Sequence, residues 1–447
     1  MNKSFSRNKC PNIVYFDNNA TTLICASAAK VHSEWISCYN ASTNSKIAAP
    51  SKQIIESATN ILLSHCGVSS ANYTAIFTSG ATESNCFIIR ACVKAYKKKI
   101  YANNSELKPH IVISAVEHPS IIDCVKDLEK SNDLEVSYVS PTIFGNILPE
   151  DVESSIKSNT CLVSIMYANN EIPVINNIRE IGEIAHKYNI PMHSDCVQIF
   201  GKYKINMPQH NIDVLSASAH KFYGPKGVGI LIINNSLIEG YGITAEISGA
   251  QQYGLRGGTE NIPGIASMMT ALRWVFKDRK KKNNKLYALR LRLLERLKKY
   301  YTFNDFANYL YEDDEDNRKF HTNADKIKKN VELVSLGPPE DKKGFILPNT
   351  VLLAICKNKG SPFCNVTLKK YLDDRGFVIS IGSACHTDIK TASHVLYAIN
   401  APGVIRRGVI RVSFGDTNTV QEVDRFASVL KDGINTQCKD LDDDFLK

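Results

Sequence analysis

Short apolar runs alternate with helix-length stretches of mixed polarity through the first half of the chain. His110–Ser114 and Cys161–Met166 are two such runs, and the second is continuously apolar, as expected of a strand buried on both faces. Stretches such as 177–189 repeat their apolar residues at the spacing of one helical face. The alternation over about 73–235 predicts an α/β fold with a mostly parallel sheet and helices on both faces.

The second half of the chain has a different pattern. Residues 262–300 are predicted as a long helical region and Val420–Lys431 as a closing helix. Leu347–Cys356 and Ile410–Gly415 are predicted strands. A chain of 447 residues is long enough for a second domain, so we expect one here.

The change of pattern sets the expected domain boundaries. We place a large domain at residues 14–262 and a smaller α+β domain at 1–13 together with 263–447. Residues 301–345 are polar and contain the acidic run Glu312–Asp316. We therefore expect a surface insertion at 301–345.

Each predicted strand of the large domain ends in polar residues. In open α/β sheets, ligands bind outside the carboxyl ends of the strands, so these polar ends should converge on one site. The residues expected at that edge are Thr82, His118, Asn169, Asp195, Gln198, Ser218, His220 and Lys221.

Lys221 carries the most specific chemistry of this group. It follows the predicted strand Val214–Ser218, and a buried lysine must either use its charge or lose its proton. A desolvated lysine amine forms Schiff bases with carbonyl cofactors, of which pyridoxal phosphate (PLP) is the commonest. An ordinary surface lysine in a turn is the alternative.

A phosphate site is predicted where the run Tyr73–Thr78 ends. Gly80 allows close backbone approach, and a helix beginning at Thr82 would point its N–H groups at an anion. An ordinary helix cap is the alternative. The glycine-rich loop 253–261 could make a second phosphate contact or serve only as a turn.

Composition narrows the function classes. The chain has 54 basic and 45 acidic residues, but the lysines are scattered, which favours solvated helix faces over nucleic-acid binding. No apolar run reaches the length of a membrane span, and the N-terminus has no apolar signal region.

The 13 cysteines point to a reduced, cytoplasmic protein. They form no pair of C-x-x-C motifs, so the sequence gives no support to a metal site.

Several sequence blocks, in order over residues 14 to about 430, resemble the NifS/IscS-type cysteine desulfurases, which are fold-type I PLP enzymes of the class V aminotransferase family. The resemblance implies a large domain with a mostly parallel seven-stranded sheet and a smaller α+β domain. The matching blocks are Thr78–Asn85, Glu117–His118, Asn169–Glu171, Asp195–Gln198, Ser218–Lys221 with Gly224–Gly227, Arg256–Asn261, Gly382–Cys385 and Arg411–Gly415.

The resemblance also implies residue roles. Lys221 would be the Schiff-base lysine, His118 would stack on the cofactor ring and take part in proton transfer, and Asp195 would pair with the ring nitrogen. Asn169 and Arg411 would bind the substrate, Arg411 through its carboxylate. The implied cofactor contacts are Ala81, Thr82, His118, Asn169, Asp195, Gln198, Ser218, His220, Lys221 and Thr259.

Cys385 is the nucleophile that the resemblance implies. It would take sulfur from L-cysteine as a persulfide, leaving L-alanine, and would lie in a mobile loop at 380–395. The implied partners are a second subunit, whose phosphate Thr259 would reach, and a protein sulfur acceptor for iron–sulfur cluster assembly or tRNA thiolation.

Two positions depart from the family pattern. Ser45 stands where the family has a histidine, and Tyr253 replaces an arginine before the glycine-rich loop. A selenocysteine lyase, another class V aminotransferase-type enzyme or a non-catalytic scaffold protein therefore remain alternatives. Dependence on Cys385 separates them, because transamination needs no thiol.

Overall fold

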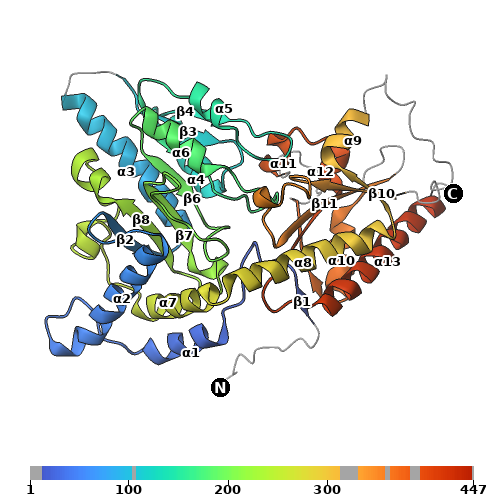
Figure 1. The fold of residues 1–447 in the computed structure, drawn as a ribbon, viewed down its shortest axis with the longest axis horizontal. Helices are drawn as coiled ribbons and strands as arrows, with labels where there is room; N and C mark the ends of the chain where they lie inside the picture. The colour runs from blue at the N-terminus through green and yellow to red at the C-terminus, as the bar shows by residue number, and fades with distance from the viewer. Residues whose placement is uncertain (1–12, 103–106, 313–330, 358–362, 383–392, 445–447) are drawn as a thin grey trace.

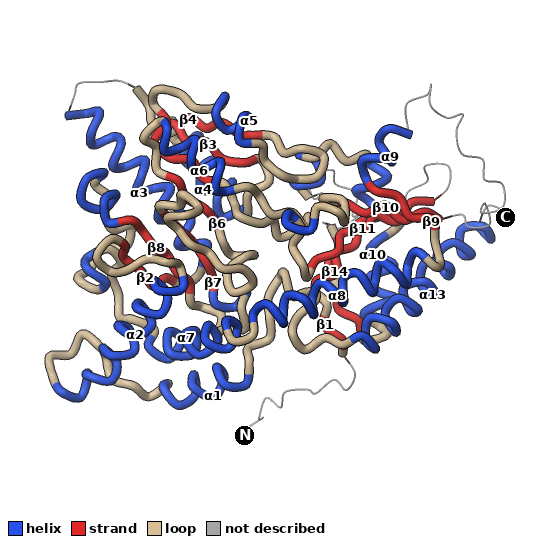
Figure 2. The backbone as a smooth tube through the Cα atoms, in the orientation of Figure 1, coloured by secondary structure: helices blue, strands red, loops and turns tan. Residues whose placement is uncertain are grey.

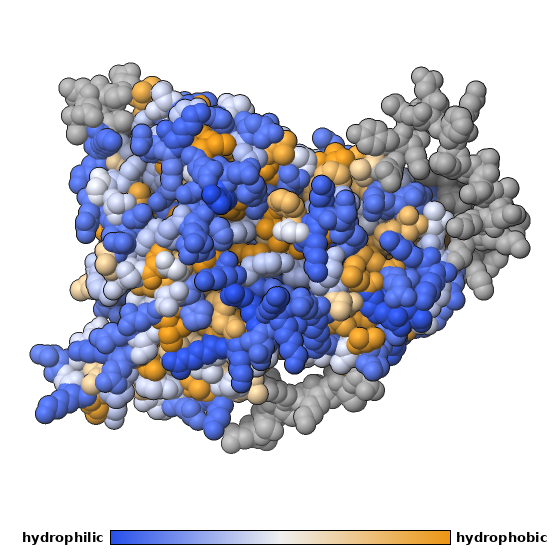
Figure 3. All heavy atoms as spheres, in the orientation of Figure 1, coloured by the Kyte–Doolittle hydropathy of each residue, from blue (hydrophilic) through white to orange (hydrophobic). Residues whose placement is uncertain are grey.

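The computed structural model describes residues 13–102, 107–312, 331–357, 363–382 and 393–444. Two α/β lobes lie side by side, and the long helices α7 (Ile262–Phe276) and α8 (Arg279–Lys298) run along the molecule from one lobe toward the other (Figure 1). The face seen in Figure 3 is largely hydrophilic over α8 and α13 (Val420–Asp444).

The larger lobe contains a seven-stranded sheet, which confirms the predicted fold class. Strand β8 is antiparallel to both of its neighbours, and all other pairs are parallel. In spatial order the strands are β2 (Tyr73–Thr78), β8 (Gly229–Asn234), β7 (Val214–Ser218), β6 (Met192–Asp195), β5 (Thr160–Ser164), β3 (His110–Ser114) and β4 (Glu135–Val139).

Side chains of successive strand residues enter two different cores, one on each face of this sheet. Ile111 and Ile113 pack with helices α3 (Ala81–Ala102) and α4 (Pro119–Lys130). Val112, between them, belongs to the opposite core. That core also contains residues of α2 (Ala49–His65), α5 (Pro149–Ser154), α6 (Ile178–Lys187) and α7, with α1 (Ala26–Trp35) packed on α7.

The smaller lobe is built on a five-stranded mixed sheet, seen in red at the right of Figure 2. Helices α8, α10 (Asn365–Asp373) and α13 share a separate hydrophobic core with it. Three short helices complete the lobe, namely α9 (Phe306–Glu312), α11 (His394–Ala398) and α12 (Gly403–Gly408). The strands in spatial order are β13 (Ser380–Ile381), β14 (Val409–Ser413), β11 (Thr350–Lys357), β10 (Val331–Leu336) and β9 (Thr302–Asp305).

The predicted domain boundaries need correction at both ends of the large domain. Strand β1 (Val14–Tyr15) pairs with β12 (Phe377–Val378), so residues 14 and 15 belong to the small lobe. Helix α7 packs on α1 and α2, so it belongs to the large lobe. The predicted helical region 262–300 is interrupted because Asp278 has a left-handed φ of 59°.

The prediction of a surface insertion at 301–345 is wrong at its edges. Strands β9 and β10 pair in parallel inside the small sheet, and Leu333 and Val334 are completely buried. The acidic composition of the middle of this region hid the two strands that flank it. Residues 313–330 lie outside the described part of the chain.

No helix in the described ranges combines the length and the apolar character needed to cross a membrane.

Candidate functional site

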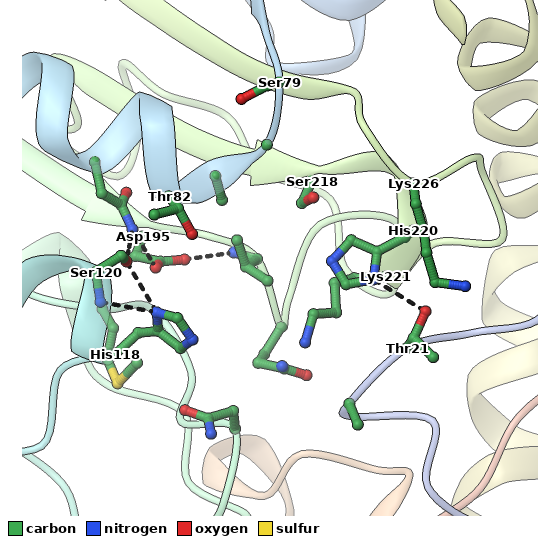
Figure 4. Close-up of a pocket in the computed structure, with 18 of the residues that line it drawn as sticks. Thr21, Ser79, Thr82, His118, Ser120, Asp195, Ser218, His220, Lys221 and Lys226 are labelled. Atoms are coloured by element: carbon green, nitrogen blue, oxygen red, sulfur yellow. Dashed lines mark hydrogen bonds between the residues drawn. The ribbon is translucent and has the colours of Figure 1, made fainter.

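A cavity of about 510 Å³ lies where the polar strand ends of the large sheet meet (Figure 4). Its volume is typical of a site for a small ligand or cofactor. It is lined by eight of the residues predicted from sequence, namely Ala81, Thr82, His118, Asp195, Gln198, Ser218, His220 and Lys221.

The topology explains why these residues converge. Strands β6 and β7 are parallel neighbours whose last residues are Asp195 and Ser218. Lys221 follows β7 after a single 3₁₀ turn, Ala219–Lys221. His118 is the N-cap of α4, just after β3, so its ring reaches the same edge of the sheet.

The N-terminus of α3 forms one end of the cavity. Ser79, Gly80, Ala81 and Thr82 line the cavity there, and helix N-termini favour anions. Gly229 allows strand β8 to lie close to the segment that leads into α3, because a Cβ on Gly229 would lie 2.3 Å from Thr78 Oγ1.

Other side chains around this end also suit a phosphate. Ser218 and Lys226 line the cavity, and His220 Nδ1 lies 3.0 Å from Thr21 Oγ1. Burial, with Lys221 and Lys226 nearby, lowers the pKa of His220 to about 4, so its ring is neutral at pH 7. The site therefore offers lysine charge together with neutral hydrogen-bonding groups.

The Lys221 amine is poised to become a nucleophile. Nζ donates a hydrogen bond of 2.6 Å to the backbone oxygen of Asn19. Burial lowers its pKa to about 8, and the positive charge of Arg411 acts in the same direction, although Asp195 and Asp17 oppose it. A lysine with this pKa supplies far more neutral amine at pH 7 than an exposed one does.

Asp195 is held rigidly on the other side of the cavity. Its Oδ1 accepts the backbone N–H of Val197 at 2.9 Å, and its Oδ2 accepts Asn85 Nδ2 at 2.8 Å. The residue is only 4% exposed. A fixed carboxylate of this kind can pair with the protonated nitrogen of a ring bound in the cavity.

His118 faces the cavity between these groups. Its Nδ1 accepts the backbone N–H of Ser120 at 3.1 Å and lies 2.9 Å from the Ser120 hydroxyl (Figure 4). Burial lowers the pKa of His118, with Lys221 and His394 adding to the effect and Asp195 opposing it. The ring is therefore neutral at pH 7.

The residues present fit the cofactor that the resemblance implies. Gln198 Oε1 and Asn85 Oδ1 are buried and have no hydrogen-bond partner among the described residues, and both side chains line the cavity. Such unsatisfied atoms are costly unless a ligand or water bonds them. Together with the anion-binding end, the amine and the carboxylate, they match a phosphate-bearing heteroaromatic aldehyde.

Asn169 does not line this cavity. Its side chain is fully buried, with Nδ2 donating to the backbone oxygen of Val116 and to Met166 Sδ, and Oδ1 accepting the N–H groups of Glu171 and Ile172. Asn170 lines the cavity instead. The predicted cofactor and substrate contacts of Asn169 therefore have no free side-chain donor in this structure.

Arg411 and Thr259 also lie outside the residues that line the cavity. Arg411 forms an ion pair with Asp17 at 2.7 Å and donates to the backbone oxygen of Asn170 at 2.9 Å. Thr259 lines a separate cavity of about 220 Å³, which shares Ser79 with the first. The predicted nucleophile Cys385 and most of the predicted loop 380–395 lie outside the described residues.

The two departures from the family pattern are accommodated on the surface. The Ser45 hydroxyl accepts the N–H of Ile47 at 3.5 Å and caps a short turn. Tyr253 is 81% exposed with a left-handed φ of 63°. Its neighbour Gln252 bonds both backbone groups of Phe77 on the edge strand β2.

Sequence reasoning missed three residues that hold the site together. Asn85 and Ser120 connect Asp195 to His118, and the Asn19 backbone oxygen receives Lys221. The spacing of Asn85 one helical turn after Ala81 could have indicated it. No sequence pattern shows which backbone oxygen will accept a hydrogen bond from a lysine side chain.

Within the described ranges, no group of three or more His, Cys, Asp or Glu side chains could hold a metal ion.

Comparisons with known proteins give a consistent result. The family model "Aminotransferase class-V" matches residues 14–309. The cysteine desulfurase IscS of Clostridium botulinum is 34% identical over 359 residues, which cover 79% of this chain and 77% of that protein.

Solved structures give the same picture. One described as a NifS-like protein has a TM-score of 0.77 at 27% identity and covers 95% of this chain and 100% of its own. Another, described as SspA in complex with cysteine, has a TM-score of 0.66 at 26% identity and covers 91% of this chain and 99% of its own.

Proposed function

The chain belongs to the class V aminotransferase family and, within it, to the cysteine desulfurases, and we propose that it passes the sulfur of L-cysteine to an acceptor as a persulfide on Cys385. It is a PLP-dependent enzyme whose substrate is cysteine and whose organic product is alanine. In the net reaction the cysteine sulfur joins the thiol of Cys385 and the remaining three-carbon amino acid leaves as alanine.

One observation carries this proposal: the Lys221 amine and the Asp195 carboxylate line the same cavity as the N-terminus of α3. Lys221 would hold the cofactor covalently, and Asp195 would bond its ring nitrogen. Ala81, Thr82, Ser218 and His220 would hold its phosphate. When bound, PLP withdraws electrons from the α-carbon of an amino acid.

Substrate recognition is assigned to Arg411. Its guanidinium is buried, and Nε has no partner among the described residues although both terminal nitrogens are used. A substrate carboxylate could bond this free donor and compete with Asp17 for the terminal nitrogen.

A homodimer is part of the proposal. Thr259 lines a cavity that is separate from the cofactor cavity of its own subunit but shares Ser79 and Gly227 with it. From there it could reach the phosphate of a second subunit.

The sulfur acceptor, either an iron–sulfur scaffold or a tRNA-thiolation protein, is the remaining partner. The cytoplasm is the proposed compartment, since the cysteines in the described ranges are free thiols.

The test is to incubate the purified protein with PLP and L-cysteine, then to measure alanine and to locate the persulfide by mass spectrometry. Lys221→Ala should abolish both the cofactor absorption band and alanine production. Cys385→Ser should keep the band but form no persulfide, whereas Cys364→Ser, which changes an exposed thiol in the described part, should behave as the wild type.

Two outcomes would contradict the proposal. If Cys385→Ser produced alanine at the wild-type rate from L-cysteine, the thiol would not be the sulfur acceptor. A selenocysteine lyase would then be the better assignment, and turnover of selenocysteine would test it, whereas a transaminase would convert L-cysteine to its keto acid and form no alanine. A protein that stays colourless with added PLP would instead favour a non-catalytic scaffold.

A further inference from the structure

The protonation state of His118 can be read from the direction of its hydrogen bonds. The backbone N–H of Ser120 lies 3.1 Å from Nδ1 of His118 and can only donate. Nδ1 must therefore present a lone pair. In a neutral imidazole the other nitrogen then carries the proton, so His118 has its N–H at Nε2.

A second donor points at the same nitrogen. The Ser120 hydroxyl oxygen lies 2.9 Å from His118 Nδ1 and 2.9 Å from Asn85 Nδ2. The amide nitrogen of Asn85 can only donate, so the hydroxyl oxygen accepts from it. The hydroxyl proton is then free to be donated to His118.

The orientation of Asn85 is itself fixed by charge. Its Nδ2 donates to Asp195 Oδ2 at 2.8 Å, and an ionised carboxylate can only accept. If the Asn85 amide were turned over, its oxygen would face that carboxylate. The cost of this orientation is that Asn85 Oδ1 is buried without a hydrogen-bond partner among the described residues.

These bonds connect Asp195 to His118 as one chain (Figure 4): the Asn85 amide nitrogen donates to Asp195 on one side and to the Ser120 hydroxyl on the other, and that hydroxyl donates to His118. The figure shows the His118 ring with Nδ1 bonded to this chain and its other nitrogen turned away from it. A protonated His118 has no lone pair at Nδ1, so it would lose the bond from the Ser120 N–H, and the Ser120 hydroxyl could stay bonded only by turning its proton away and accepting. Asp195, Lys221, His394 and Asp123 are the charged or titratable groups whose fields act on the ring.

We propose that Ser120 is a positioning residue that locks His118 in the Nε2–H form, so that His118 offers the cavity a hydrogen-bond donor and no free lone pair. Asn85 relays this orientation from Asp195, the residue assigned to the cofactor nitrogen. This inference rests on the proposed function for the identity of the group that receives the Nε2–H bond. It means that His118 can accept a proton only after its bond from the Ser120 N–H breaks.

The experiment is nuclear magnetic resonance of the whole chain with ¹⁵N-labelled histidine, measured with PLP bound and again after its removal. The two-bond ¹H–¹⁵N pattern distinguishes the two neutral tautomers, and the signal missing from His118→Gln assigns the residue among the 11 histidines. The wild type should show the Nε2–H form in both states.

Variants test whether Ser120 is responsible. Ser120→Ala removes one of the two donors, so the proportion of the other tautomer should rise on the order of five- to tenfold. Ser120→Thr keeps a hydroxyl and should restore the wild-type ratio. Ser131→Ala makes the same chemical change at the other end of α4 and should leave the ratio unchanged.

A wild-type His118 with its proton on Nδ1 would overturn the proposal, as would a Ser120→Ala protein with the wild-type tautomer ratio. The wild-type measurement stands even if Ser120→Ala does not fold. The tautomer is also measured without cofactor or substrate. A failure of this proposal is therefore distinguishable from a failure of the desulfurase assignment, which the alanine and persulfide assays report.

Discussion

Replacing Lys221 with methionine should make the cofactor-free protein more stable at pH 7, although it removes the group that holds the cofactor. Burial is the largest cause of the lowered pKa of Lys221, which falls from 10.5 to about 8. Methionine has a similar length and no charge, so it avoids the cost of a buried ammonium group. Function and stability are therefore opposed at this position.

The size of the effect follows from the pKa. The difference between 10.5 and about 8 corresponds to about 3.4 kcal/mol, because each pKa unit is worth about 1.36 kcal/mol. The variant also loses the hydrogen bond from Lys221 Nζ to the Asn19 oxygen, which offsets about 1 kcal/mol. The net gain in the free energy of unfolding should be about 2 kcal/mol.

The gain should depend on pH in a defined direction. An unfolded lysine keeps its proton up to about pH 10.5, whereas the folded Lys221 loses it above about pH 8. Between these values the unfolded state binds more protons, so the wild type becomes more stable as pH rises. Most of the advantage of Lys221→Met should therefore disappear by pH 10.

Urea unfolding of the cofactor-free proteins at pH 7 and pH 10, at one protein concentration, measures both effects. Lys226→Met is the matched control, because Lys226 lines the same cavity but is exposed, and it should change stability by less than about 0.5 kcal/mol. A Lys221→Met protein less stable than the wild type at pH 7, or an advantage that grows with pH, would refute the reasoning.

Three further substitutions test the site. Gly229→Ala places a Cβ within 2.3 Å of Thr78 Oγ1, and the overpacking should cost about 1–3 kcal/mol in urea unfolding and weaken PLP binding; unchanged binding would contradict the tight approach. Glu83→Gln breaks the ion pair with Arg256 at 2.9 Å and weakens the bond that Glu83 accepts from the Ser79 N–H at the phosphate end, so PLP affinity measured by equilibrium titration should fall about fivefold; an unchanged affinity would show that this anchoring does not matter for phosphate binding. Arg411→Lys should raise KM for L-cysteine about tenfold or more with the cofactor band intact, and a wild-type KM would remove Arg411 from substrate binding.

Much of the large lobe could be predicted from sequence because its central strands are buried on both faces. His110–Ser114 and Val214–Ser218 were predicted with the bounds that the structure has. Strand β4 was not predicted, since it lies at the sheet edge and four of its five residues are at least partly exposed. An edge strand with this exposure has no continuous apolar run to identify it.

The convergence of strand ends identified most of the site, because the parallel topology brings them to one edge. It could not decide which of two adjacent asparagines, Asn169 or Asn170, faces the cavity, since that depends on the loop conformation after β5. Nor could it find the role of Ser120, which depends on the direction of hydrogen bonds between three side chains.

The central claim is that Lys221 holds PLP, and covalent mapping tests it most directly. Borohydride reduction of the PLP-loaded protein fixes the cofactor to the lysine that carries it, and peptide mass spectrometry then locates that lysine. We expect the pyridoxyl mass on the peptide that contains Lys221, with none on Lys226, which lines the same cavity, or on Lys202, which lines an adjoining cavity together with Lys221. Label on either of those neighbours, or no label at all, would contradict the account.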